Sequence, residues 1–373
     1  MRYPSIDILR TIAIFVMVFV HFGENLSGYG VPFAGFGAPL FAFLSGVSYR
    51  LWVNGQQRKG VDEELISKIS IRRGLFVFGV GIAFNVLVWL PEDTFNWDVL
   101  TMIGTALLVL NLIRSLPLPV PVVMAVMLVL ISPILRDMAE YNAYWVNKYY
   151  EHDMTLSDIT IGFLSVGYFP IFPWLAFSLM GYVVAVLMFG DASESDPAPG
   201  TADDDADSVA ALRLPFILGT SLVLLSMALL IGRNYLPDPI AKRYLGGWHM
   251  FPPTIEYVCG TLGMALLLFG VLHHVVDRNP RSRQWTGLLR IAKTFSRYSF
   301  TIYILHHVVH LYPLWLYALL QGQEPTTFWA SALPVHISLP LGLLFMICCY
   351  FTLNWLGPER RIGIESWMRW LCD

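Results

Sequence analysis

The chain has 373 residues, of which 56% are apolar and only 14% are charged. An ordinary soluble domain carries about 25% charged residues, so this composition excludes a soluble globular domain. The mean hydropathy of +0.58 describes the whole chain, so the apolar excess is not confined to one tail. The formal net charge of −3 gives no sign of a nucleic-acid partner, and none is expected.

Apolar runs of about 18 residues or more recur between short polar stretches, as a bilayer requires. They predict an all-α polytopic membrane protein with about ten transmembrane helices in a single domain over residues 1–373. The first run lacks a small-residue cleavage site, so we expect it to be a retained span. The joint at 115–119 fits either a tight turn or a re-entrant break. The expected spans are 5–24, 32–53, 73–91, 98–113, 118–136, 162–189, 212–232, 253–276, 298–320 and 332–356.

Three groups of basic residues orient these spans, because cytoplasmic loops are enriched in Lys and Arg. An even number of spans places all three groups on one side, so both termini are expected in the cytoplasm. We therefore expect a multi-pass protein of the cell (plasma) membrane. The groups are Arg50, Arg58, Lys59, Lys68, Arg72 and Arg73; Arg278, Arg281, Arg283, Arg290, Lys293 and Arg297; and Arg360, Arg361 and Arg369.

Two segments outside the spans have a distinctive composition. Residues 190–211 contain the acidic, low-complexity run DASESDPAPGTADDD, which predicts a disordered cytoplasmic linker. Residues 358–370 (PERRIGIESWMRW) mix Arg with Ile, Trp and Met. That mixture predicts a short amphipathic helix lying in the inner membrane interface.

The first span carries Arg10 and His21 on one stripe. Eleven residues of helix separate them by about 16 Å along the axis and only about 20° around it, and Asp7 falls on the same face. One interpretation is an Asp7–Arg10 pair at the inner interface with His21 at the outer water boundary. The other is a functional imidazole, since an unperturbed pKa of about 6.5 suits proton transfer near neutral pH.

The ninth span carries Tyr303, His306, His307 and His310, whose i,i+4 pairs predict that some of them face the helix bundle. Ionisable groups within spans are costly, so each is a functional candidate. No carboxylate or cysteine accompanies these histidines at ligand spacing, so no metal is expected. Asp98 at the start of the fourth span is either catalytic or a carboxylate favoured at a helix N-terminus.

Six blocks of sequence resemble, in order, blocks of the bacterial and archaeal relatives of heparan-α-glucosaminide N-acetyltransferase. They are IDILRTIAIFVMVFVHF, FGAPLFAFLSGVSYRL, NWDVLTMIGTALLVL, FPIFPWLAFSLMGYVVA, FPPTIEYVCGTLGMALLL and YSFTIYILHHVVH. The arrangement of Arg10 and His21 is also similar to that of the wider transmembrane acyltransferase superfamily.

The resemblance implies an acyl-CoA-dependent transmembrane acetyltransferase. Its co-substrate would be cytoplasmic acetyl-CoA, and its acceptor an amino or hydroxyl group of a sugar or glycoconjugate at the far side. His21 matches the catalytic histidine and Arg10 the polar residue of the same motif. Relatives often have Gly after this Arg and Asp before this His, where the chain has Thr11 and Val20. The missing Asp puts an Asp-assisted orientation of His21 in doubt.

Within this interpretation, His21 is the expected general base, with Arg10 and Asp98 as further catalytic residues. Direct transfer and a transient acetyl-histidine both remain open. A proton-coupled small-molecule transporter is the alternative from another class, because histidines within spans would suit it too. A homodimer is compatible with either function. The residues expected to bind acetyl-CoA are Arg72, Arg73, Arg297, Tyr303 and His306.

Overall fold

The structure, a computed structural model, describes residues 2–88, 95, 97–142, 155–190, 202–237, 241, 243–356 and 362–373. These residues form helices joined by loops and turns, and they contain no β-strand. The chain divides into two compact units. Unit 1 comprises Pro39–Val271, and unit 2 comprises Arg2–Ala38 together with Leu272–Asp373.

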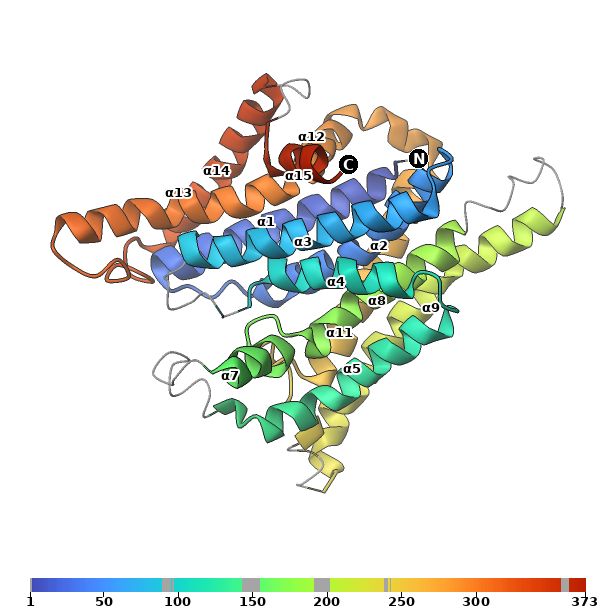
Figure 1. Cartoon of the computed structure of the whole chain (residues 1–373), viewed down its shortest axis with the longest axis horizontal. Helices are drawn as coiled ribbons and strands as arrows, with labels where there is room; N and C mark the ends of the chain where they lie inside the picture. The colour runs from blue at the N-terminus through green and yellow to red at the C-terminus, as the bar shows by residue number, and fades with distance from the viewer. Residues whose placement is uncertain are drawn as a thin grey trace. The chain divides into compact units, whose positions relative to one another are not determined.

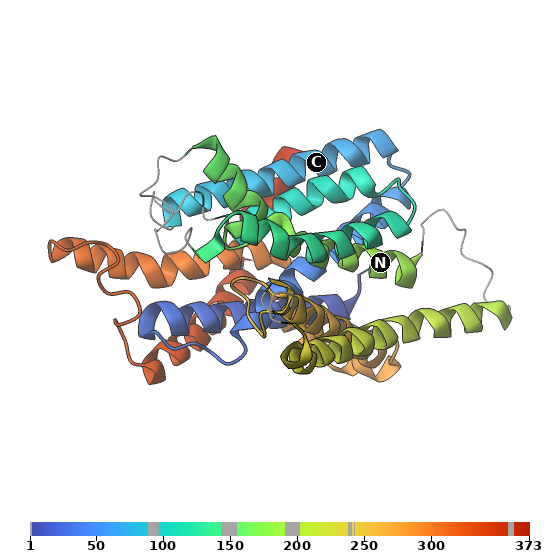
Figure 2. The ribbon, with the colours of Figure 1, turned by 90° about the horizontal axis from the view of Figure 1, so that it is seen from below.

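Unit 1 consists of helices that pack in pairs, some adjacent in the chain and some distant. α3 lies along α4, and α5 lies along α8, which also contacts α4 and α9 (Figures 1 and 2). Most of α8 is buried, so it forms the centre of the unit. The helices are α2 (Gly37–Gln57), α3 (Glu63–Val88), α4 (Val99–Ile113), α5 (Pro119–Met138), α7 (Leu156–Ile161), η3 (Gly162–Val166), α8 (Ile171–Phe189), α9 (Ala202–Gly232), η4 (Arg233–Tyr235) and α11 (Ile255–Leu272).

Glycines set the closest helix contacts of unit 1. A Cβ added at Gly46 on α2 would overlap the backbone carbonyl of Ser178 on α8, and one added at Gly181 would overlap the carbonyl of Phe43. The backbones of α2 and α8 therefore meet directly. Small residues at such crossings are typical of membrane helices, where association depends on close packing.

Unit 2 is organised around α1, which packs against α12, α13 and α14 (Figure 1). Pro4 at the first turn suits the start of α1, and Gly28 in the left-handed conformation ends it. The helices of this unit are α1 (Pro4–Ser27), η1 (Ala34–Phe36), η5 (His273–Asp277), η6 (Pro280–Gln284), α12 (Thr286–Arg297), α13 (Ser299–Leu320), α14 (Val335–Leu356) and α15 (Ile364–Cys372).

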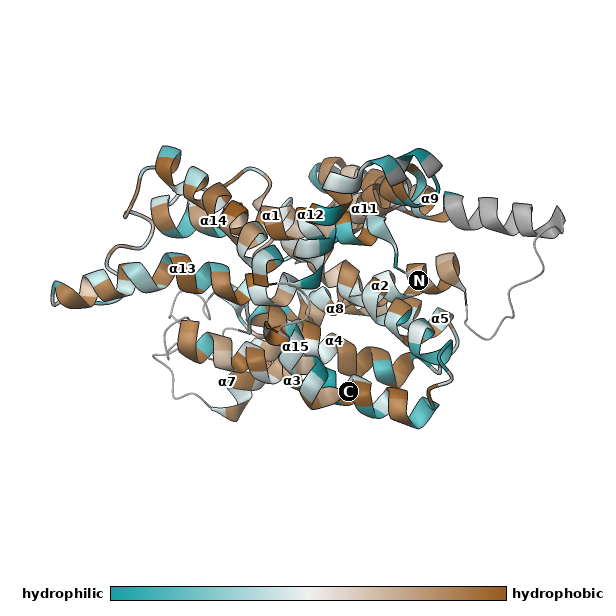
Figure 3. Ribbon diagram, turned by 90° about the horizontal axis from the view of Figure 1, so that it is seen from above, coloured by the Kyte–Doolittle hydropathy of each residue, from teal (hydrophilic) through white to brown (hydrophobic). Residues whose placement is uncertain are grey.

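The protein is an all-α polytopic membrane protein, as the sequence predicts. Within the described residues, eight helical segments are long and apolar enough to cross a membrane. Figure 3 shows apolar residues along most of the length of helices such as α3 and α5. The other two expected spans are helices as well, but α4 has only 15 residues and α2 contains Arg50 and several other polar residues. The orientation of the spans, with both termini cytoplasmic, stays a prediction.

Several boundaries differ from those expected. α3 begins at Glu63, ten residues before the expected third span, because its first turns are polar but helical. The expected sixth span, 162–189, is divided into η3 and α8 by a break around Pro170. The joint at 115–119 is a tight turn, since α4 ends at Ile113 and α5 begins at Pro119.

Three segments outside the expected spans also differ from, or add to, the sequence interpretation. Of the acidic segment 190–211, residues 191–201 lie outside the described residues, and α9 begins at Ala202. The basic joint before the ninth span contains the amphipathic helix α12, which hydropathy did not reveal. The expected C-terminal amphipathic helix is α15, on which Trp367 and Trp370 are mostly exposed.

Candidate functional site

Three histidine side chains from two helices converge within unit 2. His21 on α1 lies beside His306 and His307 on α13, and we call these three residues the imidazole cluster. The ring centroids lie 4.4 Å apart for His21 and His307, 5.3 Å for His21 and His306, and 4.0 Å for His306 and His307. The sequence predicted that histidines of the ninth span would face the bundle and left two interpretations of His21 open. The fold of unit 2 brings the two stripes together.

The three imidazoles differ in exposure. His306 and His307 are fully buried, whereas His21 is half-buried. Tyr303, one turn earlier on α13, is also buried and places its ring 5.7 Å from that of His306 and 5.8 Å from that of His307. His21 is therefore the most exposed of the three rings.

Asn25 and His310 form a hydrogen-bonded pair one helical turn beyond the imidazole cluster. Nδ1 of His310 lies 2.5 Å from the backbone carbonyl oxygen of His306, so Nδ1 carries the proton and donates it. Nε2 of His310 therefore accepts from the Nδ2 amide of Asn25, 2.9 Å away on α1. Both ring nitrogens of His310 are therefore occupied by structural hydrogen bonds. Asn25 was missed from the sequence, although its place four residues after His21 puts it on the same helix face.

Arg10 lies near the beginning of α1 and is hydrogen-bonded to α12. Its guanidinium donates to the Oγ of Ser296 at 2.7 Å and to the Ser296 carbonyl at 3.3 Å. Asp7 accepts from Arg2 instead, with Nε to Oδ2 at 2.7 Å. Arg297, the last residue of α12, lies over the ring of Tyr298, with Cζ 5.7 Å from the ring centroid. Arg10 and Arg297 thus both bring positive charge to the C-terminal turn of α12.

The remaining expected site residues belong to unit 1. Asp98 is a helix cap: its Oδ1 accepts from the backbone N–H of Leu100 at 2.9 Å and so begins α4. Arg72 and Arg73 lie within α3, where Arg72 is exposed and Arg73 stacks on Trp52 with Cζ 4.6 Å from the ring centroid. A catalytic role for Asp98 and CoA binding by Arg72 and Arg73 stay predictions.

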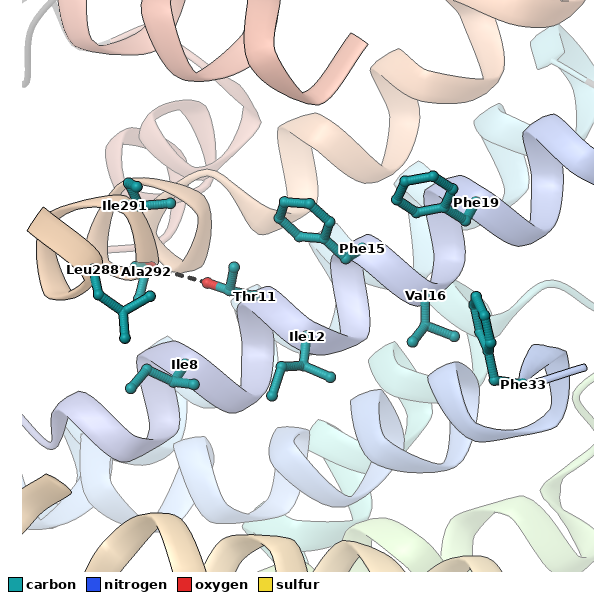
Figure 4. A pocket seen from close by; sticks show the side chains of 10 residues that line it. All are labelled: Ile8, Thr11, Ile12, Phe15, Val16, Phe19, Phe33, Leu288, Ile291 and Ala292. Carbon is teal, nitrogen blue, oxygen red and sulfur yellow. Dashed lines mark hydrogen bonds between the residues drawn. The ribbon is translucent and has the colours of Figure 1, made fainter. Parts of the chain in front are cut away.

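An apolar groove of about 450 Å³ runs along the other side of α1, between α1, α12 and Phe33 (Figure 4). Its single hydroxyl, that of Thr11, lies 2.7 Å from the carbonyl oxygen of Asp7 and 3.1 Å from that of Ala292, and donates to this pair of acceptors. Ile12, which lines the groove, is nine residues before His21 and therefore about 180° from it around the helix. The groove offers no polar group to a sugar and lies away from the imidazole cluster.

The geometry of unit 2 suits proton transfer at a partly accessible imidazole. His21 presents an accessible edge, and the neighbouring rings and the His310–Asn25 pair restrict its surroundings. A positioned histidine of this kind can accept a proton from a hydroxyl or amino group as that group attacks a carbonyl carbon.

Comparison with known proteins then identifies the family. The family described as heparan-alpha-glucosaminide N-acetyltransferase, catalytic, matches residues 2–204, which is more than half of the chain. The match contains Arg10, His21, Arg72, Arg73 and Asp98, whereas the histidines of α13 lie beyond it. No curated protein matches the chain. The chain therefore belongs to the heparan-alpha-glucosaminide N-acetyltransferase catalytic family, a family of membrane acyltransferases.

Proposed function

We propose that this protein transfers an acetyl group from cytoplasmic acetyl-CoA to an amino or hydroxyl group of a sugar or glycoconjugate at the far side of the cell membrane. The observation that carries the proposal is the position of His21. This residue lies in the part of the chain that matches the acetyltransferase family, and it is the accessible member of the imidazole cluster. The polar surroundings of His21 inside an apolar bundle fit a functional role.

In this mechanism, His21 is the general base. Its ring nitrogen takes the proton from the acceptor as the acceptor's nitrogen or oxygen attacks the thioester carbonyl carbon. The new bond to carbon forms, the carbon–sulfur bond breaks, and the CoA sulfur leaves with the electron pair and regains a proton. An acetyl-histidine intermediate would use the same nitrogen as the nucleophile, so both routes require His21. Arg10, held by Ser296, keeps a cation on the same face of α1.

The phosphates of CoA call for arginine or lysine side chains at the cytoplasmic ends of the helices. Arg297 in unit 2 is the first candidate, because α12 also exposes Arg290 and Lys293. In unit 1 the candidates are Arg72, which is exposed, and Arg73, which stacks on Trp52. We expect Arg297→Ala and Arg72→Ala, each made alone, to raise the KM for acetyl-CoA more than they lower kcat. Tyr303 and His306 would line the part of the acetyl-CoA site that holds the thioester.

The proposal is tested by acetyl transfer from radiolabelled acetyl-CoA to amino sugars, using purified protein in lipid nanodiscs. His21→Ala is expected to lower the rate at least ~100-fold, the usual range for removing a general base, while the protein remains folded. His336→Ala is the matched control, since His336 is exposed on α14 and should leave the rate unchanged. Full activity in folded His21→Ala would refute the assignment of the base.

The same preparation separates the enzyme from a proton-coupled transporter. Acetyl transfer requires CoA binding, which isothermal titration calorimetry measures directly. A transporter would instead move a small molecule into proteoliposomes under a pH gradient without consuming acetyl-CoA. Asp98→Asn keeps an oxygen that can cap α4, so a loss of activity in this folded variant would support a catalytic role for Asp98. The homodimer stays a prediction.

A further inference from the structure

The imidazole cluster has the donor set of a transition-metal site. One ring nitrogen from each of His21, His306 and His307 lies within 4.8 Å of the other two. Three imidazoles with an open fourth position form a known catalytic zinc ligand set, and imidazole suits Zn²⁺ well. Sequence spacing pointed away from a metal because the third ligand comes from a different helix.

His306 is already oriented as a ligand would be. Its Nδ1 lies 3.2 Å from the backbone carbonyl of Ile302 and donates to it, which leaves the lone pair on Nε2. Nε2 is buried and has no hydrogen-bond partner among the described residues. Histidines that bind metals typically donate their other N–H to a backbone carbonyl or a carboxylate, which fixes the ring in this way.

His310 explains why the donor set has three members and not four. Both of its nitrogens are occupied, one by the carbonyl of His306 and the other by Asn25. The fourth position would face the accessible side of His21, where a water molecule or an anion can complete a tetrahedron.

We propose that the imidazole cluster binds one Zn²⁺ ion, and that this ion inhibits the enzyme by occupying the proton-accepting nitrogen of His21. The three imidazole lone pairs form the bonds to zinc, and no covalent bond breaks. Binding does not depend on the proposed function, whereas inhibition rests on His21 being the general base. Zinc is therefore a reversible regulator, not a resident cofactor of the reaction.

Only small side-chain movements are needed. Zn–N bonds of about 2.0–2.1 Å place the nitrogens of a tetrahedral site about 3.4 Å apart. The nitrogens lie within 4.8 Å of one another, so no separation must shorten by more than about 1.4 Å. Rotation of the half-buried His21 ring and of the His306 and His307 rings can supply this change.

The binding test uses the full chain in nanodiscs, purified without a histidine tag and treated with EDTA. Co²⁺ is the spectroscopic probe, because tetrahedral Co²⁺ absorbs strongly in the visible range. One Co²⁺ per chain, with a tetrahedral spectrum and displacement by one Zn²⁺, is the expected result. A spectrum without these bands, or binding only at several weak sites, would overturn the proposal.

Variants locate the ion. His307→Ala and His307→Gln, the second of which retains a polar side chain of similar length, should each weaken Zn²⁺ binding at least about tenfold. His336→Ala tests an exposed histidine, and Cys348→Ser tests the exposed cysteine; both should bind zinc as the unaltered protein does. Unchanged binding in both His307 variants would place the ion elsewhere and overturn the site.

Acetyl transfer provides the second readout. Zinc should inhibit the unaltered enzyme, EDTA should restore the rate, and in His307→Gln the inhibitory zinc concentration should rise by the same factor as the zinc Kd. Zinc binding at the cluster in a protein that transfers no acetyl group would contradict the proposed function alone. Acetyl transfer by a protein whose imidazole cluster fails to bind added zinc would contradict the inference alone. Zinc that activates an EDTA-treated enzyme would overturn the inhibitory role.

Discussion

Two helix contacts, one in each unit, illustrate two ways of packing helices in a membrane. In unit 1, α2 and α8 approach backbone to backbone at Gly46 and Gly181, and a hydrogen bond between the hydroxyls of Ser45 and Ser178 crosses the same contact. In unit 2, α1 and α13 meet through polar side chains, among them His21 and the Asn25–His310 pair. The first contact supplies stability by close packing. The second keeps costly polar groups inside the bundle, which is typical of a functional site.

A larger side chain at the glycine contact between α2 and α8 should prevent unit 1 from folding. Gly46→Val would drive a side chain into the carbonyl of Ser178, and backbone cannot move aside as a flexible side chain can. We expect the largest effect here: little folded protein on size-exclusion chromatography. Gly55→Val on the same helix is the matched control, because a Cβ at Gly55 meets no atom within 4 Å. Equal yields of the two variants would mean that α2 and α8 do not meet at these glycines.

Removing one member of the Asn25–His310 pair in unit 2 should destabilise the protein less than a side chain at Gly46 does. Asn25→Ala removes the donor to Nε2 of His310 and leaves a buried acceptor unsatisfied, at a cost of about 1–3 kcal/mol. We expect a lower thermal midpoint in detergent and slower acetyl transfer, because the pair supports the imidazole cluster. Asn234→Ala, at an exposed position in η4, should change the midpoint little. A midpoint that Asn25→Ala leaves unchanged would show that the pair contributes nothing to unit 2.

The smallest effect is expected at the beginning of α13. Glu365 of α15 accepts from the backbone N–H groups of Phe300 and Thr301 at 2.7 and 3.1 Å, and so places a negative charge at the helix N-terminus. Glu365→Gln keeps the shape but removes the charge, which should cost about 0.5–1 kcal/mol. The thermal midpoint measures this loss, with Glu324→Gln in an exposed loop as control. A midpoint that rises would contradict the capping role.

Much of the fold could be predicted from the sequence, because hydropathy reports directly on burial in lipid. Each of the ten expected spans overlaps a helix, although several boundaries differ. Hydropathy was less informative where helices are polar, as in the first turns of α3 and throughout α12. An amphipathic helix of 12 residues has no apolar run long enough for hydropathy to predict it.

The candidate site was predictable only one helix at a time. Helical spacing correctly placed Arg10 and His21 on one stripe, and it predicted that histidines of α13 would face the bundle. It could not show that His21 meets His306 and His307, because contacts between distant segments depend on tertiary packing. The same limit hid the pairing of Arg10 with Ser296 and that of Asn25 with His310.

The central claim is that His21 accepts the proton of the attacking group, and a cryo-EM structure of the full chain with acetyl-CoA and an unreactive acceptor analogue tests it most directly. The account predicts that the acceptor's attacking position lies within hydrogen-bond distance of a ring nitrogen of His21 and next to the thioester carbonyl of the donor. An acceptor and thioester bound away from His21, with a different ionisable side chain beside the attacking position, would contradict it.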